Sequence, residues 1–62
     1  MKLASYESET ILVELLKEKK YIVHKFRKFD GVLKTVRSFS TNKMDEAMEV
    51  FDILINDNPN EE

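Results

Sequence analysis

The chain has 62 residues, of which 42% are hydrophobic and 35% charged, and its net charge is -2. These proportions are typical of a folded domain rather than of a disordered chain, and the length allows one domain at most. The sequence has no Cys and one Gly, which excludes disulfides, thiolate metal sites and glycine-rich phosphate-binding loops.

Residues 1 to 62 are predicted to form a single small domain, with flexible ends at residues 1 to 4 and 57 to 62. A domain this short buries only about 60% of the surface that its unfolded chain exposes, so we expect a homodimer or a bound partner to support it. The sequence begins without the apolar run of a secretory signal, and no window approaches the roughly 18 apolar residues of a membrane span. We therefore expect a cytoplasmic protein without membrane contact.

Residues 5 to about 20 are predicted to form a helix, which Ser5 or Ser8 can cap and which three lysines close. Val13 falls outside the apolar stripe of this helix. The alternative is a strand over residues 10 to 16, as part of a three-stranded meander. The segment "KEKK" argues against it, because it offers no Gly, Asn or Pro for a tight turn. The stripe consists of Ile11, Leu12, Leu15 and Leu16.

Residues 20 to 40 are predicted to form a β-hairpin that turns at Asp30-Gly31, a pair typical of tight turns. Two registers are open. If Phe29, Asp30 and Gly31 form a three-residue loop, one face carries Tyr21, Val23, Lys25, Arg27, Leu33, Arg37 and Phe39, and the other carries Ile22, His24, Phe26, Val32 and Val36. If Asp30-Gly31 is a two-residue turn, Phe29 opposes Val32 and the second strand exchanges its faces relative to the first.

The segment "STNKMDEAMEVFDILIND" predicts a second helix, capped by Thr41 or Asn42 and ended before Pro59. The predicted fold is thus a two-layer α+β domain in the order helix, strand, strand, helix (αββα). The alternative is the meander followed by the C-terminal helix (βββα). The second helix has an apolar stripe of Met44, Ala47, Met48, Phe51, Leu54 and Ile55, widened by Val50 and Ile53.

Charge is distributed unevenly along the chain. Nine of the ten Lys and Arg residues lie between Lys17 and Lys43, a segment with a net charge of +7, whereas Met44 to Glu62 carries -7. A basic hairpin with many aromatic residues can bind phosphates through its cations and bases through its rings. The cations proposed for this role are Lys25, Arg27, Lys34 and Arg37, and the rings are Tyr21 and Phe39, with Phe29 also available.

Two other interpretations of the charge pattern remain open. The hairpin or the acidic C-terminal helix can bind a protein partner, as in a regulator or inhibitor, or the basic hairpin can simply pack beside an acidic helix in the same fold. The sequence pI of 5.4 argues against a dedicated nucleic-acid-binding domain, for which a pI above about 9 is expected.

Catalytic and metal-binding patterns are absent from the sequence. His24 is the only His, so neither a zinc site of ordinary composition nor a nucleophilic triad is expected. We therefore expect a non-enzymatic binding protein without a cofactor.

The "FDGV" turn and the helix entry "SFSTNKMDEA" give residues 8 to 56 an element order that resembles the small head-to-tail joining protein of lambda-like phages. The run "FDGVLKTVRSFSTNKMDEA" is also similar to the hairpin-to-helix part of the arm-type DNA-binding domains of phage integrases, whose sheet binds DNA. These resemblances imply an accessory protein of a phage or mobile element, either a structural assembly subunit or a nucleic-acid-binding protein.

Overall fold

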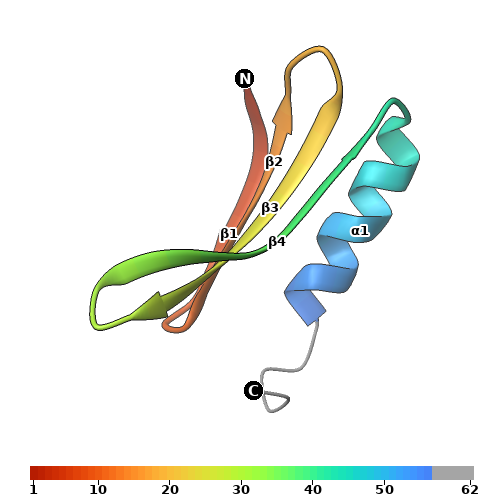
Figure 1. Cartoon of the computed structure of the whole chain (residues 1–62). Coiled ribbons are helices and arrows are strands. Elements are labelled where there is room, and N and C mark those ends of the chain that lie inside the picture. The colour runs from red at the N-terminus through yellow and green to blue at the C-terminus, as the bar shows by residue number, and fades with distance from the viewer. Residues whose placement is uncertain (57–62) are drawn as a thin grey trace.

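The computed structural model describes residues 1–56 as one antiparallel sheet and one helix (Figure 1). The strands are β1 (Lys2–Glu7), β2 (Ile11–Lys17), β3 (Tyr21–Phe29) and β4 (Val32–Thr41), and the helix is α1 (Met44–Asn56). Their spatial order is β1-β2-β3-β4, so every strand pairs with its neighbour in the sequence. Residues 57–62, predicted to be a flexible end, lie outside the described residues.

The predicted helix-first order is wrong. Residues predicted to be a helix form β1 and β2 instead, and the α+β class is retained through the C-terminal helix. The alternative strand over residues 10 to 16 corresponds to β2, but β1 had not been predicted in either version. The reason lies in β2, where Ile11, Val13 and Leu15 are all buried on one side of the sheet, a period of two rather than of 3.6.

The turn between β1 and β2 is held by Ser8. Its Oγ accepts hydrogen bonds from the backbone N–H groups of Thr10 and Ile11, each at 3.3 Å, and its own N–H donates to the Ile11 carbonyl at 2.9 Å. Ser8 had been predicted to cap a helix. The same side-chain chemistry satisfies backbone groups in a turn just as well, because both structures leave N–H groups without strand or helix partners.

The turn between β2 and β3 consists of Glu18, Lys19 and Lys20, and the Glu18 N–H donates to the Lys20 carbonyl at 2.9 Å. None of these three residues has a positive φ. The turn therefore does not require Gly or Asn, and the argument against a meander from the composition of "KEKK" is incorrect.

The β3–β4 hairpin turns on Asp30 and Gly31, with φ angles of 51° and 81°, and Phe29 pairs with Val32. Two consecutive positive φ angles are characteristic of the tight two-residue hairpin turn. Beyond the turn, a β-bulge leaves Val36 of β4 without a cross-strand partner, so that Lys25 pairs with Arg37.

The bulge reconciles the two predicted registers. The two-residue turn sets the faces near the tip, and the bulge shifts them back along the rest of the hairpin. Tyr21, Val23 and Lys25 therefore share a face with Arg37 and Phe39, as the three-residue register had predicted.

Helix α1 lies across β2, β3 and β4 on one face of the sheet (Figure 1). Ala47 and Leu54 are buried in the core, whereas Met44, Met48 and Ile53 are 46%, 51% and 56% exposed. The stripe that contacts the sheet is thus rotated away from the two methionines and consists of Ala47, Val50, Phe51, Leu54 and Ile55. The core contributed by the sheet consists of Ile11, Val13, Leu15 and Val23.

The opposite face of the sheet is covered by none of the described residues, and we call it the open face. Because side chains alternate along a strand, this face carries the residues that directly precede and follow each core residue in the sequence. Its central apolar side chains are half-buried rather than buried. The centre of the open face consists of Leu12, Glu14, Leu16, Ile22, His24, Phe26, Ser38 and Ser40, and its periphery of Lys2, Ser5, Glu7, Lys28, Leu33 and Thr35.

Candidate nucleic-acid interface

The six residues proposed from the sequence as a binding site fall into two groups. Tyr21 and Phe39 pack against the core on the side of the sheet that α1 covers. Lys25 is 6% exposed and is the buried charged residue of the described chain. Arg27 is half-buried, and Lys34 and Arg37 are exposed. The structure thus leaves three of the four proposed cations at the surface and places two proposed stacking rings against the core.

The four cations lie together on the β3–β4 hairpin. Lys25 pairs directly with Arg37, and Arg27 pairs directly with Lys34, so both cross-strand pairs join like charges. We call these four residues the basic cluster. Side chains that face each other across an antiparallel pair have Cβ atoms about 5 Å apart, and like charges at this spacing destabilise the pair.

Apolar side chains at the tip of the hairpin accompany the basic cluster. Phe29 is 47% exposed, Val32 63%, Leu33 47% and Val36 43%. The guanidinium of Arg27 lies over the Phe29 ring, 5.3 Å from its centroid. A ring in this position can stack on a base while the adjacent cations contact phosphates. In Figure 1 the hairpin tip lies on the side of the molecule away from α1.

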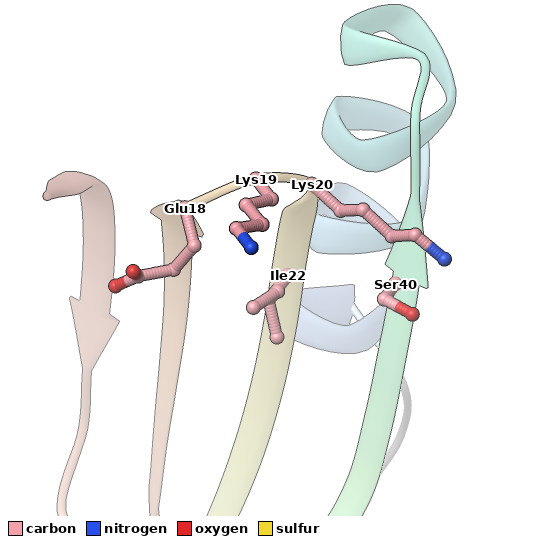
Figure 2. Close-up of a pocket in the computed structure, with 5 residues that line it drawn as sticks. All are labelled: Glu18, Lys19, Lys20, Ile22 and Ser40. Atoms are coloured by element: carbon pink, nitrogen blue, oxygen red, sulfur yellow. The ribbon is translucent and has the colours of Figure 1, made fainter.

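A second basic region lies at the other end of β3. Glu18, Lys19, Lys20, Ile22 and Ser40 line an open groove of about 400 Å³ (Figure 2). The Lys17 ammonium lies 4.8 Å from the centroid of the Tyr21 ring, which fixes this lysine near the turn. The groove is shallow, and the negative charge of Glu18 offsets one of its two lysines, so it is a weaker anion site than the basic cluster.

A row of polar side chains crosses the open face. Glu14 pairs with His24, and His24 pairs with Ser38, whose Oγ lies 3.1 Å from His24 Nδ1. The residue types are those of a nucleophilic triad. However, acyl transfer also needs N–H donors that point toward the reacting oxygen, and the backbone N–H groups of three adjacent strands are used in the ladders of the sheet. We therefore interpret the row as a polar surface feature rather than a catalytic site, in which Ser38 contacts His24 and Glu14 Oε2 accepts from Lys2 Nζ at 3.3 Å.

Lys28 ties β3 to the β1–β2 turn at the rim of the open face. Its Nζ donates to Glu7 Oε2 at 2.6 Å and to the Ser8 carbonyl at 2.8 Å. The hydrogen bond from Lys28, together with its positive charge, lowers the pKa of Glu7 below the ordinary value of 4.5. This lysine therefore has a structural role.

The sequence placed His24 and Phe26 together on one face of the hairpin, but neither was proposed as a site residue. They lie side by side on the open face, with ring centroids 6.0 Å apart. The signal for an uncovered face was the alternation, because placing Val23 in the core requires both of its neighbours in the sequence to point away from the core. Among residues 1–56, no three His, Asp or Glu side chains are grouped closely enough to hold a metal ion.

Comparisons with known proteins do not assign the chain to a family. No protein-family model, no curated protein and no solved structure matches the chain. Within the part of the chain that the structure describes, no helix is long and apolar enough to span a membrane.

Proposed function

We propose that this protein binds nucleic acid through the far end of its β3–β4 hairpin. The observation that carries the proposal is the grouping of four cations next to an exposed apolar tip. The cations form two cross-strand pairs, Lys25 with Arg37 and Arg27 with Lys34. The duplex backbone is a dense linear array of phosphates, and a protein gains affinity for it by releasing condensed counterions. A two-stranded ribbon fits the major groove of B-DNA.

The side chains have different roles in this proposal. Lys34 and Arg37 are exposed on β4 and contact phosphates, and Arg27 contacts phosphate from β3 while its guanidinium stays over Phe29. Phe29 replaces Tyr21 and Phe39 as the stacking ring, because those two pack against the core. Lys25 is too buried for direct contact.

The proposed activity is binding without catalysis. The basic cluster consists of Lys and Arg side chains rather than of an acid and base pair. A small binding protein of this kind acts by occupying a site on the nucleic acid. The resemblance to arm-type DNA-binding domains points in the same direction.

The test is fluorescence anisotropy with a labelled duplex and a labelled single strand of matched sequence. The variant Lys34→Glu/Arg37→Glu changes two exposed side chains, and Lys19→Glu/Lys20→Glu is the matched control, since it changes the net charge equally at the opposite end of β3. We expect the first variant to lose affinity at least about tenfold and the control to stay within about threefold of wild type. An amide spectrum of each variant verifies the fold.

Salt dependence gives a second criterion. Removing two phosphate contacts should reduce the slope of log K against log salt concentration by about 1.8 on duplex DNA, at roughly 0.9 per contact. An equal loss of affinity in both variants would mean that net charge alone determines binding, and it would contradict a site on the hairpin. Absence of binding by wild-type protein at low salt would contradict the function itself.

A further inference from the structure

The open face has a symmetric pattern on its two central strands. Leu12 pairs with Phe26, Glu14 with His24, and Leu16 with Ile22. Along β2 and β3 the face therefore consists of an apolar pair, a polar pair and a second apolar pair. The four apolar side chains are half-buried, because their neighbours in the sheet cover part of their surface and none of the described residues lies over them.

This pattern is self-complementary. If a second, identical face is placed on the first by a two-fold axis that runs along the strands between β2 and β3, β2 of one copy lies over β3 of the other. Leu12 then faces the partner's Phe26, and Leu16 faces the partner's Ile22. Glu14 faces the partner's His24, so that both polar groups meet a polar group rather than an apolar one.

The two edges of the sheet are protected against association. Each edge strand carries a β-bulge, at Leu3 in β1 and at Val36 in β4. β4 also has Lys34 and Arg37, and β1 begins with Lys2. Bulges and charged side chains on edge strands are the features by which proteins prevent strand pairing between copies. These features favour self-association through a face of the sheet over association through its edges.

A face-to-face dimer would use most of the open face. The sheet has four strands of six to ten residues each. A stable dimer of standard size buries about 800 Å² of each partner, so the contact must extend over all four strands rather than over the central two alone. A small domain with one uncovered sheet face gains its missing core from this contact.

We propose that a second copy of this chain packs on the open face and forms a sandwich of two sheets between two outer helices. The sheets lie about 10 Å apart, with their strands within about 30° of each other. The contact leaves the basic cluster of both copies outside the interface, because that cluster lies on the opposite side of each sheet. The inference is therefore independent of the proposed nucleic-acid binding.

The first experiment is sedimentation equilibrium of the wild-type chain from 1 μM to 1 mM, compared with two single variants in the two apolar pairs, Leu12→Glu and Ile22→Glu. A carboxylate in either pair would be buried without a partner, so we expect the dissociation constant to rise at least about tenfold. The matched control is Ile53→Glu on α1, which changes a 56% exposed side chain outside the open face and should leave dimerisation unchanged.

A second measurement does not depend on variants in the apolar pairs. The chain has no Cys, so a single nitroxide can be attached at Ser38→Cys on the open face or at Asp52→Cys on the exposed side of α1. Spin-labelled protein is mixed with isotope-labelled, unmodified protein. The two-fold axis places β4 of one copy over β1 of the other, with Ser38 over Ser5. The expected result is broadening of the amide signals of β1, strongest near Ser5, and of residues 12–16 by the label at position 38, but not by that at position 52.

Three results would overturn the proposal: a monomer at 1 mM, dimerisation unchanged by both Leu12→Glu and Ile22→Glu, or broadening by the label at position 38 that leaves β1 and β2 unaffected. If the chain is monomeric and an oligonucleotide shifts the signals of the open face instead, nucleic acid is its occupant and a second copy is not.

Discussion

The two faces of the sheet are built from the same strands but differ in what covers them. On one face Val13 and Val23 are fully buried beneath α1, whereas Leu12, Leu16 and Ile22 remain half-buried on the other. In many antiparallel sheets the second face is polar, and an alternating sequence shows it. Here β2 has apolar side chains on both faces of the sheet. Within the described residues, α1 covers only one of these faces.

The largest expected effect compares adjacent leucines on opposite faces. Leu15 is 2% exposed in the core, and Leu15→Ala should destabilise the fold by about 2–5 kcal/mol because it leaves a cavity. Leu16→Ala, on the open face, should cost less than about 1 kcal/mol when the chain is dilute. Urea unfolding at low micromolar concentration measures both, and equal costs would contradict the difference between the faces.

A second test concerns the contact of α1 with its face. Ala47 is fully buried between the helix and the sheet, and Ala47→Leu should cost about 1–3 kcal/mol because there is no space for the larger side chain. Met48→Leu changes the next residue, which is 51% exposed, and should leave the unfolding midpoint nearly unchanged. If the two substitutions had the same effect, the helix would contact the sheet through another stripe.

The β3–β4 turn sets the strand register at the hairpin tip and so determines on which face of the sheet each side chain lies. Gly31 has a φ of 81°, and a Cβ at this position would meet no atom within 4 Å. Gly31→Ala should therefore lower the free energy of unfolding only through backbone strain at this positive φ, by about 1 kcal/mol. Thermal unfolding measures this change. Asp30→Gly is the control and should lie within a few tenths of a kcal/mol of wild type. A neutral Gly31→Ala would contradict the turn.

The smallest effect depends on pH and involves Glu7 at the rim of the open face. Because Lys28 lowers the pKa of folded Glu7, the pair stabilises the fold above the pKa of Glu7 in the unfolded chain and loses this contribution as the pH falls through the folded pKa. Glu7→Gln should thus be slightly less stable than wild type at pH 7 and equally stable in strong acid. The effect is small because the Glu7 side chain is 62% exposed.

Thermal unfolding of wild type and Glu7→Gln from pH 2 to pH 7 measures this difference. Lys28→Met serves as the control, since Glu7→Gln should have no further pH-dependent effect in its background. A difference in stability that grows toward acid would contradict the assignment.

The sequence allowed the hairpin turn and the C-terminal helix to be predicted, because Asp30-Gly31 and the segment from Met44 onward carry strong local signals. The first half of the chain was assigned incorrectly. With Ile11, Leu12, Leu15 and Leu16 all apolar, β2 satisfies a helical stripe as well as a strand buried on one face and half-buried on the other. The residue that did not fit the helix, Val13, is one of the two most completely buried side chains.

The candidate site was predictable only in part, for a related reason. The concentration of positive charge in the hairpin was evident from the composition, and the pairing of Arg27 with Lys34 follows once the turn is known. The accessibility of each residue depends on α1, which covers Tyr21 and Phe39 from a distant part of the sequence. Local patterns do not contain that information.

The meander topology also determines how quickly the sheet can assemble. Each strand pairs with the strand next to it in the sequence, across turns of two or three residues, so each pairing closes only a short loop. Low contact order of this kind places folding near the fast end of the range for β-rich domains, on the order of milliseconds. The contact between α1 and β2 spans the intervening hairpin, so it closes a longer loop than any pairing of neighbouring strands.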